Sequence, residues 1–177
     1  SFLERNRAAM GDSPSYRFID YAQNPDGEII ELSWNGLWTQ VNAVAARLQQ
    51  VTAPRDRVAI LAPQGVDYVA AFFAAVHAGN IAVPLFAPAL AGHTERLAAV
   101  LSDAKPSAVL TTTAAAEAVR AFIKTLPAAE RPRVIAVDAV PDSLADMHVD
   151  PGSRTDDVAY LQYTSGSTRT PAGVEIT

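Results

Sequence analysis

The sequence predicts an α/β fold in which a mainly parallel sheet carries helices on both faces, with a β-hairpin near the N-terminus. Short apolar runs suited to buried strands alternate with longer segments of helical periodicity. Connections of this kind form right-handed βαβ units. With 49% hydrophobic and 19% charged residues, the composition is that of a globular protein. The 177 residues are enough for one domain with a sizeable core.

The hairpin is expected from residues 16–21 and 28–32, two strand-like runs on either side of the turn sequence Asn-Pro-Asp-Gly at 24–27. Ser33 fits a helix N-cap, because its hydroxyl can accept a hydrogen bond from a free amide of the first turn. Apolar residues then recur at helical spacing: Trp34, Leu37, Trp38, Val41, Val44, Ala45 and Leu48. They form a single stripe, so one face of this helix should pack on the core.

The parallel part begins at residue 57. Apolar runs predict strands at 57–62, 81–85, 108–111, 133–137 and 158–163. Helical segments are predicted between them at 66–78, 94–104 and 114–126. The helix at 66–78 is apolar nearly all round and should be buried, with Gly79 suited to its C-cap. Residues 138–156 are polar and contain Pro and Asp, which predicts a loop, and residues 174–177 have the character of a further strand.

Composition excludes several classes of function. A net charge of −5 argues against a nucleic-acid partner, because phosphate backbones bind basic surfaces. The absence of cysteine excludes disulfides, thiolate zinc sites and cysteine nucleophiles from this span. The apolar stretches are too short to cross a bilayer, and the first residues lack the layout of a signal peptide. We therefore expect a cytoplasmic protein with no transmembrane segment and no nucleic-acid partner.

The segment after residue 163 carries the candidate chemistry, since ligands of parallel α/β sheets bind beyond the carboxyl ends of the strands. It holds four hydroxyl residues and one glycine, which supply closely spaced donors and a backbone able to approach an anion: Thr164, Ser165, Gly166, Ser167 and Thr168. Arg169 adds a cation suited to phosphate oxygens. On composition alone a plain Ser/Thr/Gly turn between two strands stays open. The segment is not a Walker A loop, G-x-x-x-x-G-K-S/T.

Residues 163–173 resemble the signature Y-T-S-G-S/T-T-G-x-P-K-G of the adenylate-forming superfamily. The matching positions are Tyr163, Thr164, Ser165, Gly166, Ser167, Thr168, Pro171 and Gly173. Arg169 stands where the superfamily has Gly, and Ala172 stands where it has Lys. This pair of departures is similar to the fatty acyl-AMP ligase branch, of the mycobacterial type. Residues 57–64 and 79–85 also resemble segments of the family, so the likeness extends over most of the chain.

The resemblance implies that residues 1–177 are a single partial domain, the first subdomain of the N-terminal domain of such an enzyme, ending just after its phosphate-binding loop. The implied reaction is ATP-dependent activation of a fatty acid to acyl-adenylate with release of pyrophosphate, followed by transfer to an acyl carrier protein of a polyketide or lipid synthase. The implied ATP-phosphate-binding residues are Thr164, Ser165, Gly166, Ser167, Thr168, Arg169 and Gly173. The catalytic residues and the Mg²⁺ ligand are expected outside this span, so the piece alone should be inactive.

Two other functions stay open, namely a fatty acyl-CoA synthetase and a non-catalytic nucleotide-binding or interaction module. We hypothesise that Arg169 restores part of the charge that Ala172 removes from the loop. No histidine pair has metal-ligand spacing, so no metal site is expected. His77 is expected to be a satisfied histidine at a helix end, and His93 and His148 to be surface residues. The pair Asp156-Asp157 is expected to start a strand after a solvated turn and not to form a carboxylate dyad.

Overall fold

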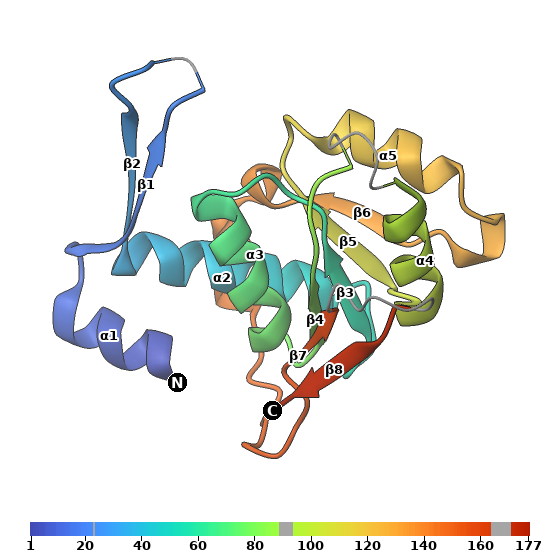
Figure 1. Ribbon diagram of the computed structural model, residues 1–177. Helices are drawn as coiled ribbons and strands as arrows, with labels where there is room; N and C mark the ends of the chain where they lie inside the picture. The colour runs from blue at the N-terminus through green and yellow to red at the C-terminus, as the bar shows by residue number, and fades with distance from the viewer. Residues whose placement is uncertain (23, 89–93, 164–170) are drawn as a thin grey trace.

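The computed structural model describes residues 1–22, 24–88, 94–163 and 171–177 (Figure 1). The strands are β1 (Pro14–Asp20), β2 (Glu28–Ser33), β3 (Arg57–Ile60), β4 (Ile81–Pro84), β5 (Ala108–Thr111), β6 (Arg133–Ala136), β7 (Tyr160–Tyr163) and β8 (Gly173–Ile176). The helices are α1 (Phe2–Met10), α2 (Trp34–Gln49), α3 (Val66–His77), α4 (Thr94–Ala104) and α5 (Ala116–Lys124), with short 3-10 turns η1 (Ala128–Glu130), η2 (Val137–Ala139) and η3 (Asp142–Met147). The strand and helix types match the sequence prediction, and most bounds agree within two residues.

The main sheet has six strands in the order β6-β5-β3-β4-β7-β8. The first five run parallel, and β8 returns antiparallel to β7 at the edge. The hairpin β1–β2 forms a separate antiparallel pair that projects away from this sheet (Figure 1). The predicted α/β class, with its mainly parallel sheet and N-terminal hairpin, is confirmed.

Helices cover both faces of the sheet because alternate strand residues point to opposite sides. On β3, Val58 and Ile60 pack into one core with α2 and α3, whereas Ala59 packs into a second core with α4 and α5. All three are fully buried. Strands buried on both faces consist of continuous apolar runs, which is why these strands could be predicted from the sequence.

Helix α1 was not predicted from the sequence, although its start carries a capping box. The Ser1 hydroxyl accepts a hydrogen bond from the Glu4 amide, and the Glu4 side chain bonds back to the first residue. Leu3 is buried against the core of α2 and α3. The S-x-x-E pattern was therefore a usable signal for this helix.

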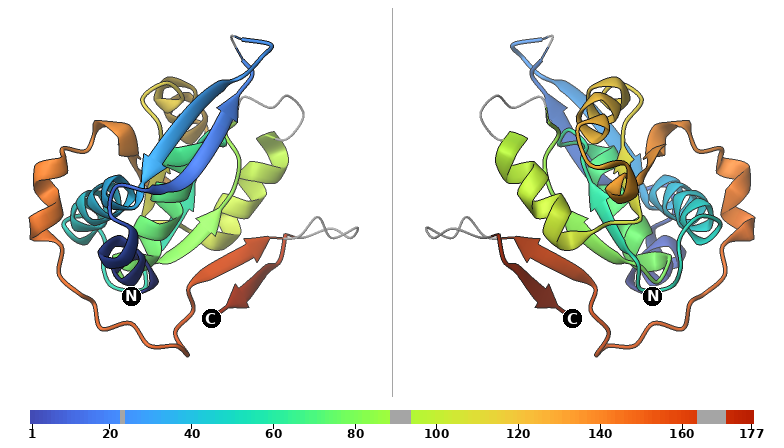
Figure 2. Two further views of the ribbon diagram at one scale, coloured as in Figure 1. Left: turned by 90° about the vertical axis from the view of Figure 1, so that its left-hand side faces the viewer. Right: turned by 90° about the vertical axis from the view of Figure 1, so that its right-hand side faces the viewer.

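The predicted loop at 138–156 is more ordered than the sequence indicated. Residues 138–157, here called the strap, include most of η2 and all of η3, and η3 packs along α2. The strap passes outside α2 on its way from β6 to β7 (Figure 2). It thereby connects the strand at one edge of the sheet to the strand beside β4. Among the described residues, no helix has the length and apolar character needed to cross a membrane.

Candidate functional site

The candidate loop leaves the sheet at the end of β7 and rejoins it at the start of β8. Tyr163 and Gly173 are directly paired across these two antiparallel strands, so they close the base of the loop. A Cβ atom on Gly173 would lie 3.0 Å from Cζ of Tyr163 and 3.2 Å from its hydroxyl oxygen. A side chain at position 173 would therefore crowd the tyrosine ring, which explains on steric grounds why a glycine fits this position.

The Tyr163 ring fixes the end of β7 to helix α4. Its side chain is buried, and its hydroxyl donates a 2.5 Å hydrogen bond to Oδ2 of Asp103 on α4. Burial, and then the hydrogen bond to this carboxylate, raise the pKa of Tyr163 well above its usual value. The phenol consequently stays protonated and continues to donate throughout the physiological range.

Most of the sequence-predicted site residues lie outside the described residues. These are Thr164, Ser165, Gly166, Ser167, Thr168 and Arg169, all within 164–170. Gly173 is described, and it lies at the base of the loop as the first residue of β8. Ala172, which stands in the place of the superfamily lysine, is exposed next to it. The assignment of these residues to ATP phosphates stays a prediction.

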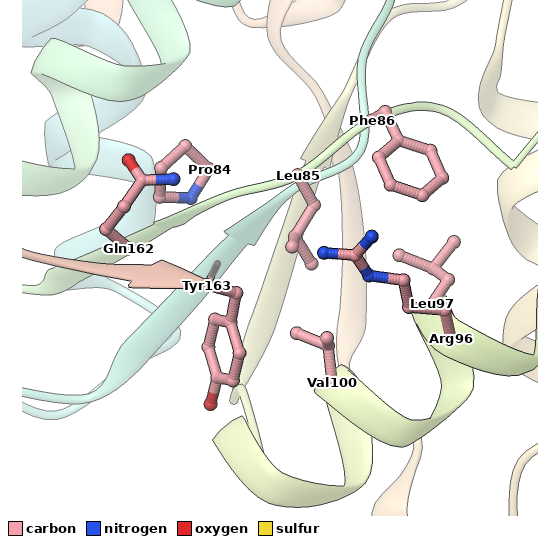
Figure 3. A pocket seen from close by; sticks show the side chains of 8 residues that line it. All are labelled: Pro84, Leu85, Phe86, Arg96, Leu97, Val100, Gln162 and Tyr163. Atoms are coloured by element: carbon pink, nitrogen blue, oxygen red, sulfur yellow. The ribbon is translucent and has the colours of Figure 1, made fainter. Parts of the chain in front are cut away.

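Two cavities open at the carboxyl ends of β3, β4 and β7. One, of about 340 Å³, lies between β4, β7 and α4 and is lined by Pro84, Leu85, Phe86, Arg96, Leu97, Val100, Gln162 and Tyr163 (Figure 3). The other, of about 690 Å³, is lined mainly by apolar residues after β3 and β4, by the start of α3 and by Phe18 of the hairpin. The two cavities share Leu85 and Phe86. The carboxyl edge of the sheet is thus hollowed where ligands of such sheets bind.

One wall of the larger cavity is held by Tyr68 of α3. Its hydroxyl donates a 2.9 Å hydrogen bond to the carbonyl oxygen of Leu85, just after β4. Burial raises the pKa of Tyr68, so the hydroxyl keeps its proton and the bond persists. This bond fixes the residue that separates the two cavities.

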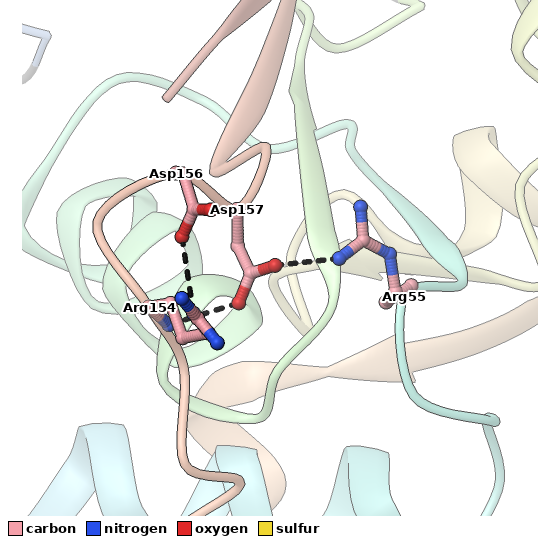
Figure 4. Close-up of polar contacts among 4 residues, drawn as sticks. All are labelled: Arg55, Arg154, Asp156 and Asp157. Carbon is pink, nitrogen blue, oxygen red and sulfur yellow. Dashed lines mark hydrogen bonds and ion pairs between the residues drawn. The ribbon is translucent and has the colours of Figure 1, made fainter.

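The turn before β7 is organised by charge. Asp157 accepts a 2.6 Å hydrogen bond from Arg55 and a 2.8 Å bond from the backbone amide of Arg154 (Figure 4). The backbone amide first, and then the Arg55 guanidinium, lower the pKa of this carboxyl. Asp156 instead pairs with the Arg154 side chain. Arg154 thus contacts both carboxylates, Asp157 through its backbone amide and Asp156 through its side chain. The pair lies in the turn and does not start the strand, because β7 begins only at Tyr160.

The structure brings together two histidines for which the sequence predicted no contact. The rings of His77, at the end of α3, and His148, in the strap, stack with centroids 4.2 Å apart. Nε2 of His148 lies 3.0 Å from the carbonyl oxygen of His77. The expectation of a satisfied His77 is wrong, because its Nε2 is buried without a hydrogen-bond partner among the described residues. His148 is half-buried and not a free surface residue. Their separation of 71 positions gave no sequence signal.

Within the described part of the chain, no group of three or more His, Cys, Asp or Glu side chains is arranged to hold a metal ion. The stacked histidines pack the end of α3 against the strap.

Comparison with known proteins adds findings of three kinds, on the family, on relatives and on the fold. The model of a family described as AMP-binding enzyme matches residues 3–177. The long-chain-fatty-acid–AMP ligase FadD32 of Mycolicibacterium smegmatis is 57% identical over 99% of this chain, which spans 28% of that relative's length. A 4-hydroxyphenylalkanoate adenylyltransferase of Mycobacterium marinum is 44% identical over 96% of the chain and is covered over 26% of its own length.

The third kind of finding concerns the fold. A crystal structure of a fatty acyl-adenylate ligase from L. pneumophila, in complex with acyl adenylate and pyrophosphate, superposes with a TM-score of 0.84. The match covers 99% of this chain and 29% of that one, at 24% sequence identity. The arrangement of layers and strands described above is therefore shared with that protein.

Proposed function

We propose, because the chain belongs to the AMP-binding enzyme family, that the whole protein activates a fatty acid with ATP to give an acyl-adenylate and pyrophosphate. The acyl group then passes to the phosphopantetheine thiol of an acyl carrier protein of a polyketide or lipid synthase. The 57% identity to a long-chain-fatty-acid–AMP ligase over 99% of the chain is the observation that carries this proposal. The departures from the superfamily signature at Arg169 and Ala172 support the same branch.

In the proposed reaction a carboxylate oxygen of the acid attacks the α-phosphorus of ATP. The bond from this phosphorus to the oxygen bridging the α- and β-phosphates breaks, and pyrophosphate leaves with that oxygen. Such a reaction needs positioning and charge stabilisation more than proton transfer. Hydroxyls and amides of residues 164–168 would bind the β- and γ-phosphates, and the Tyr163–Gly173 pair would fix the base of the loop. ATP is expected to enter with Mg²⁺, whose ligand we place outside residues 1–177.

Arg169 is proposed to supply the loop charge that Ala172 lacks. A guanidinium can bind two phosphate oxygens at once, and one hydrogen bond to a charged group contributes about 1.5–3 kcal/mol. In the full-length protein, Arg169→Ala should therefore raise the KM for ATP about tenfold or more. Unchanged ATP affinity and an unchanged rate in this variant would discard the assignment.

The products formed by the full-length protein test the proposal as a whole. With ATP, Mg²⁺ and a long-chain fatty acid, we expect acyl-AMP and pyrophosphate, detected by mass spectrometry and by exchange of labelled pyrophosphate into ATP. Addition of a phosphopantetheinylated acyl carrier protein should yield the acylated carrier, whereas free coenzyme A should yield no acyl-CoA. A 4-hydroxyphenylalkanoate serves as the comparison acid, because one relative is named for it.

Each other outcome has a definite meaning. Efficient formation of acyl-CoA would make the protein a fatty acyl-CoA synthetase. Exchange with the aromatic acid alone would transfer the proposal to that class of acid. Binding of ATP without any acid-dependent exchange would indicate a non-catalytic nucleotide-binding module.

A further inference from the structure

We propose that Arg96, on α4, is a second anion-binding residue that contacts the leaving pyrophosphate portion of ATP from the cavity beside Tyr163. The proposal rests on the proposed function and adds to it a residue outside the signature loop. Arg96 lines the cavity of about 340 Å³ together with Gln162 and Tyr163, the last two residues of β7. These are the residues that immediately precede the candidate phosphate loop.

The position of the Arg96 side chain supports this assignment. Its guanidinium extends from α4 toward Leu85, on the side of the cavity where Tyr163 ends β7 (Figure 3). Tyr163 is itself bound to α4 through Asp103, about two helical turns after Arg96. Helix α4 and the end of β7 are therefore joined, so the cation keeps a fixed relation to the point where the loop begins.

The charge of Arg96 has no counterpart among the described residues. The cations in the salt bridges of that part of the chain are the N-terminus of Ser1 and the side chains of Arg17, Arg55 and Arg154, and no hydrogen bond of Arg96 occurs there either. Arg96 also lies in the first turn of α4, the end of a helix where the macrodipole disfavours a cation by about 0.3–1 kcal/mol. An exposed arginine in this position is stabilised when an anion binds beside it.

The chemistry of the cavity selects phosphate as that anion. Its walls are largely apolar, from Leu85, Leu97 and Val100, so a charge inside it is less screened than on an open surface. A guanidinium presents paired donors that match phosphate oxygens. The signature loop lacks its lysine at Ala172 and holds one arginine, Arg169. Arg96 adds a second cation to the phosphate site, from α4.

The test measures binding to the full-length protein by calorimetry, with ATP, pyrophosphate and AMP as separate probes. Arg96→Gln, which keeps much of the length but removes the charge, should weaken ATP and pyrophosphate about tenfold or more, the size expected for one charge-assisted contact. AMP, which lacks the β- and γ-phosphates, should bind as it does to the wild type. Arg96→Lys should recover part of the loss. Arg120→Ala removes an exposed arginine from α5 and should change none of the three.

The outcomes separate this inference from the proposed function. Equal weakening of AMP, or unchanged pyrophosphate affinity in Arg96→Gln, overturns the role of Arg96 even if the wild type makes acyl-AMP. A wild type that binds ATP and pyrophosphate but forms no acyl-AMP refutes the proposed activity and leaves the binding test intact. Thermal unfolding of each variant serves as the folding control. If Arg96→Gln unfolds at a lower temperature than the wild type, Arg96→Lys takes its place in the comparison. Weaker binding of pyrophosphate and ATP than in the wild type, with AMP binding unchanged, then sustains the role of Arg96, and unchanged binding of all three probes overturns it.

Discussion

His77 is surrounded by rings at the last turn of α3. Its imidazole stacks on His148 and meets the Trp38 indole edge-on, with centroids 5.6 Å apart. Burial first, and then the neighbouring His148, lower the pKa of His77 to about 4. Asp150 and Glu4 act in the opposite direction but do not offset the burial. His77 is therefore neutral at physiological pH, and protonating it would place a charge on a ring whose buried Nε2 has no hydrogen-bond partner among the described residues.

This depressed pKa links the stability of the region to pH. Unfolded histidine titrates near 6.5, so between about pH 6.5 and 4 the unfolded state binds more protons than the folded state. Stability is therefore complete above about pH 6.5 and falls as the pH drops toward 4. The total is on the order of 2 kcal/mol once solvent screening of this half-buried ring is allowed for.

Replacing His77 with Phe should remove this dependence, because the ring packing remains while the titrating group is lost. Hydrogen exchange of the peptide covering residues 72–85 of the full-length protein, corrected for intrinsic rates, reports the local stability. From pH 7 to pH 5 the wild type should lose protection there, and His77→Phe should lose distinctly less. A parallel loss in both proteins would show that other groups carry the pH dependence.

At the level of secondary structure, elements with clear periodicity and capping residues form where the sequence predicted them. Helix α4 and strand β5 have the bounds that the sequence predicted, and Ser33 caps α2 by accepting a 3.0 Å hydrogen bond from the Gly36 amide. The prediction of Gly79 as the C-cap of α3 is wrong by one residue: Ala78 is the cap, and Gly79 follows it with φ of +79°, a conformation that glycine adopts without strain. Periodicity and capping chemistry depend on neighbouring residues, so a single sequence contains them.

Tertiary contacts decided the remaining features. The 3-10 turns of the strap have no periodic pattern, and they pack on α2, which lies about a hundred positions earlier in the chain. The signature loop could be proposed from the sequence, since its four hydroxyl residues, one glycine and one arginine are consecutive. Arg96 could not, because only the pairing of β4 with β7 brings α4 next to the end of that strand. The contact between His77 and His148 is likewise tertiary, because it forms only where the strap packs beside the end of α3.

On the scale of the whole molecule, the strap determines where β7 enters the sheet. It runs from β6, at one edge, around α2 and back to β4, where the parallel pairing aligns Ala82 with Tyr160 (Figure 2). Its last residues are held by the ion pair of Arg55 with Asp157 (Figure 4). A segment that sets the position of β7 also sets the position from which the signature loop departs.

Gln49 of α2 attaches the middle of the strap to that helix through two hydrogen bonds. Its Nε2 donates to the Val149 carbonyl oxygen at 2.7 Å, and its Oε1 accepts from the Val149 amide at 3.1 Å. One side chain thus satisfies both backbone groups of a strap residue, as a neighbouring strand would. Nearby, a Cβ on Gly79 would lie 2.7 Å from Cβ of Pro151, so the strap passes α3 at close range.

Gln49→Ala should therefore loosen the strap without disturbing the core, since both lost bonds are replaced by water at a net cost of about 1–2 kcal/mol. In the full-length protein, hydrogen exchange should rise across residues 142–157 and extend into β7, and the KM for ATP should increase as the loop base becomes less fixed. Gln50→Ala is the matched control, because the exposed Gln50 side chain accepts a hydrogen bond from Arg47 of α2 and, among the described residues, makes none to the strap. Faster exchange in the strap with no change in β7 would mean that β7 is held by its neighbouring strands alone, and that the strap only connects the two edges of the sheet.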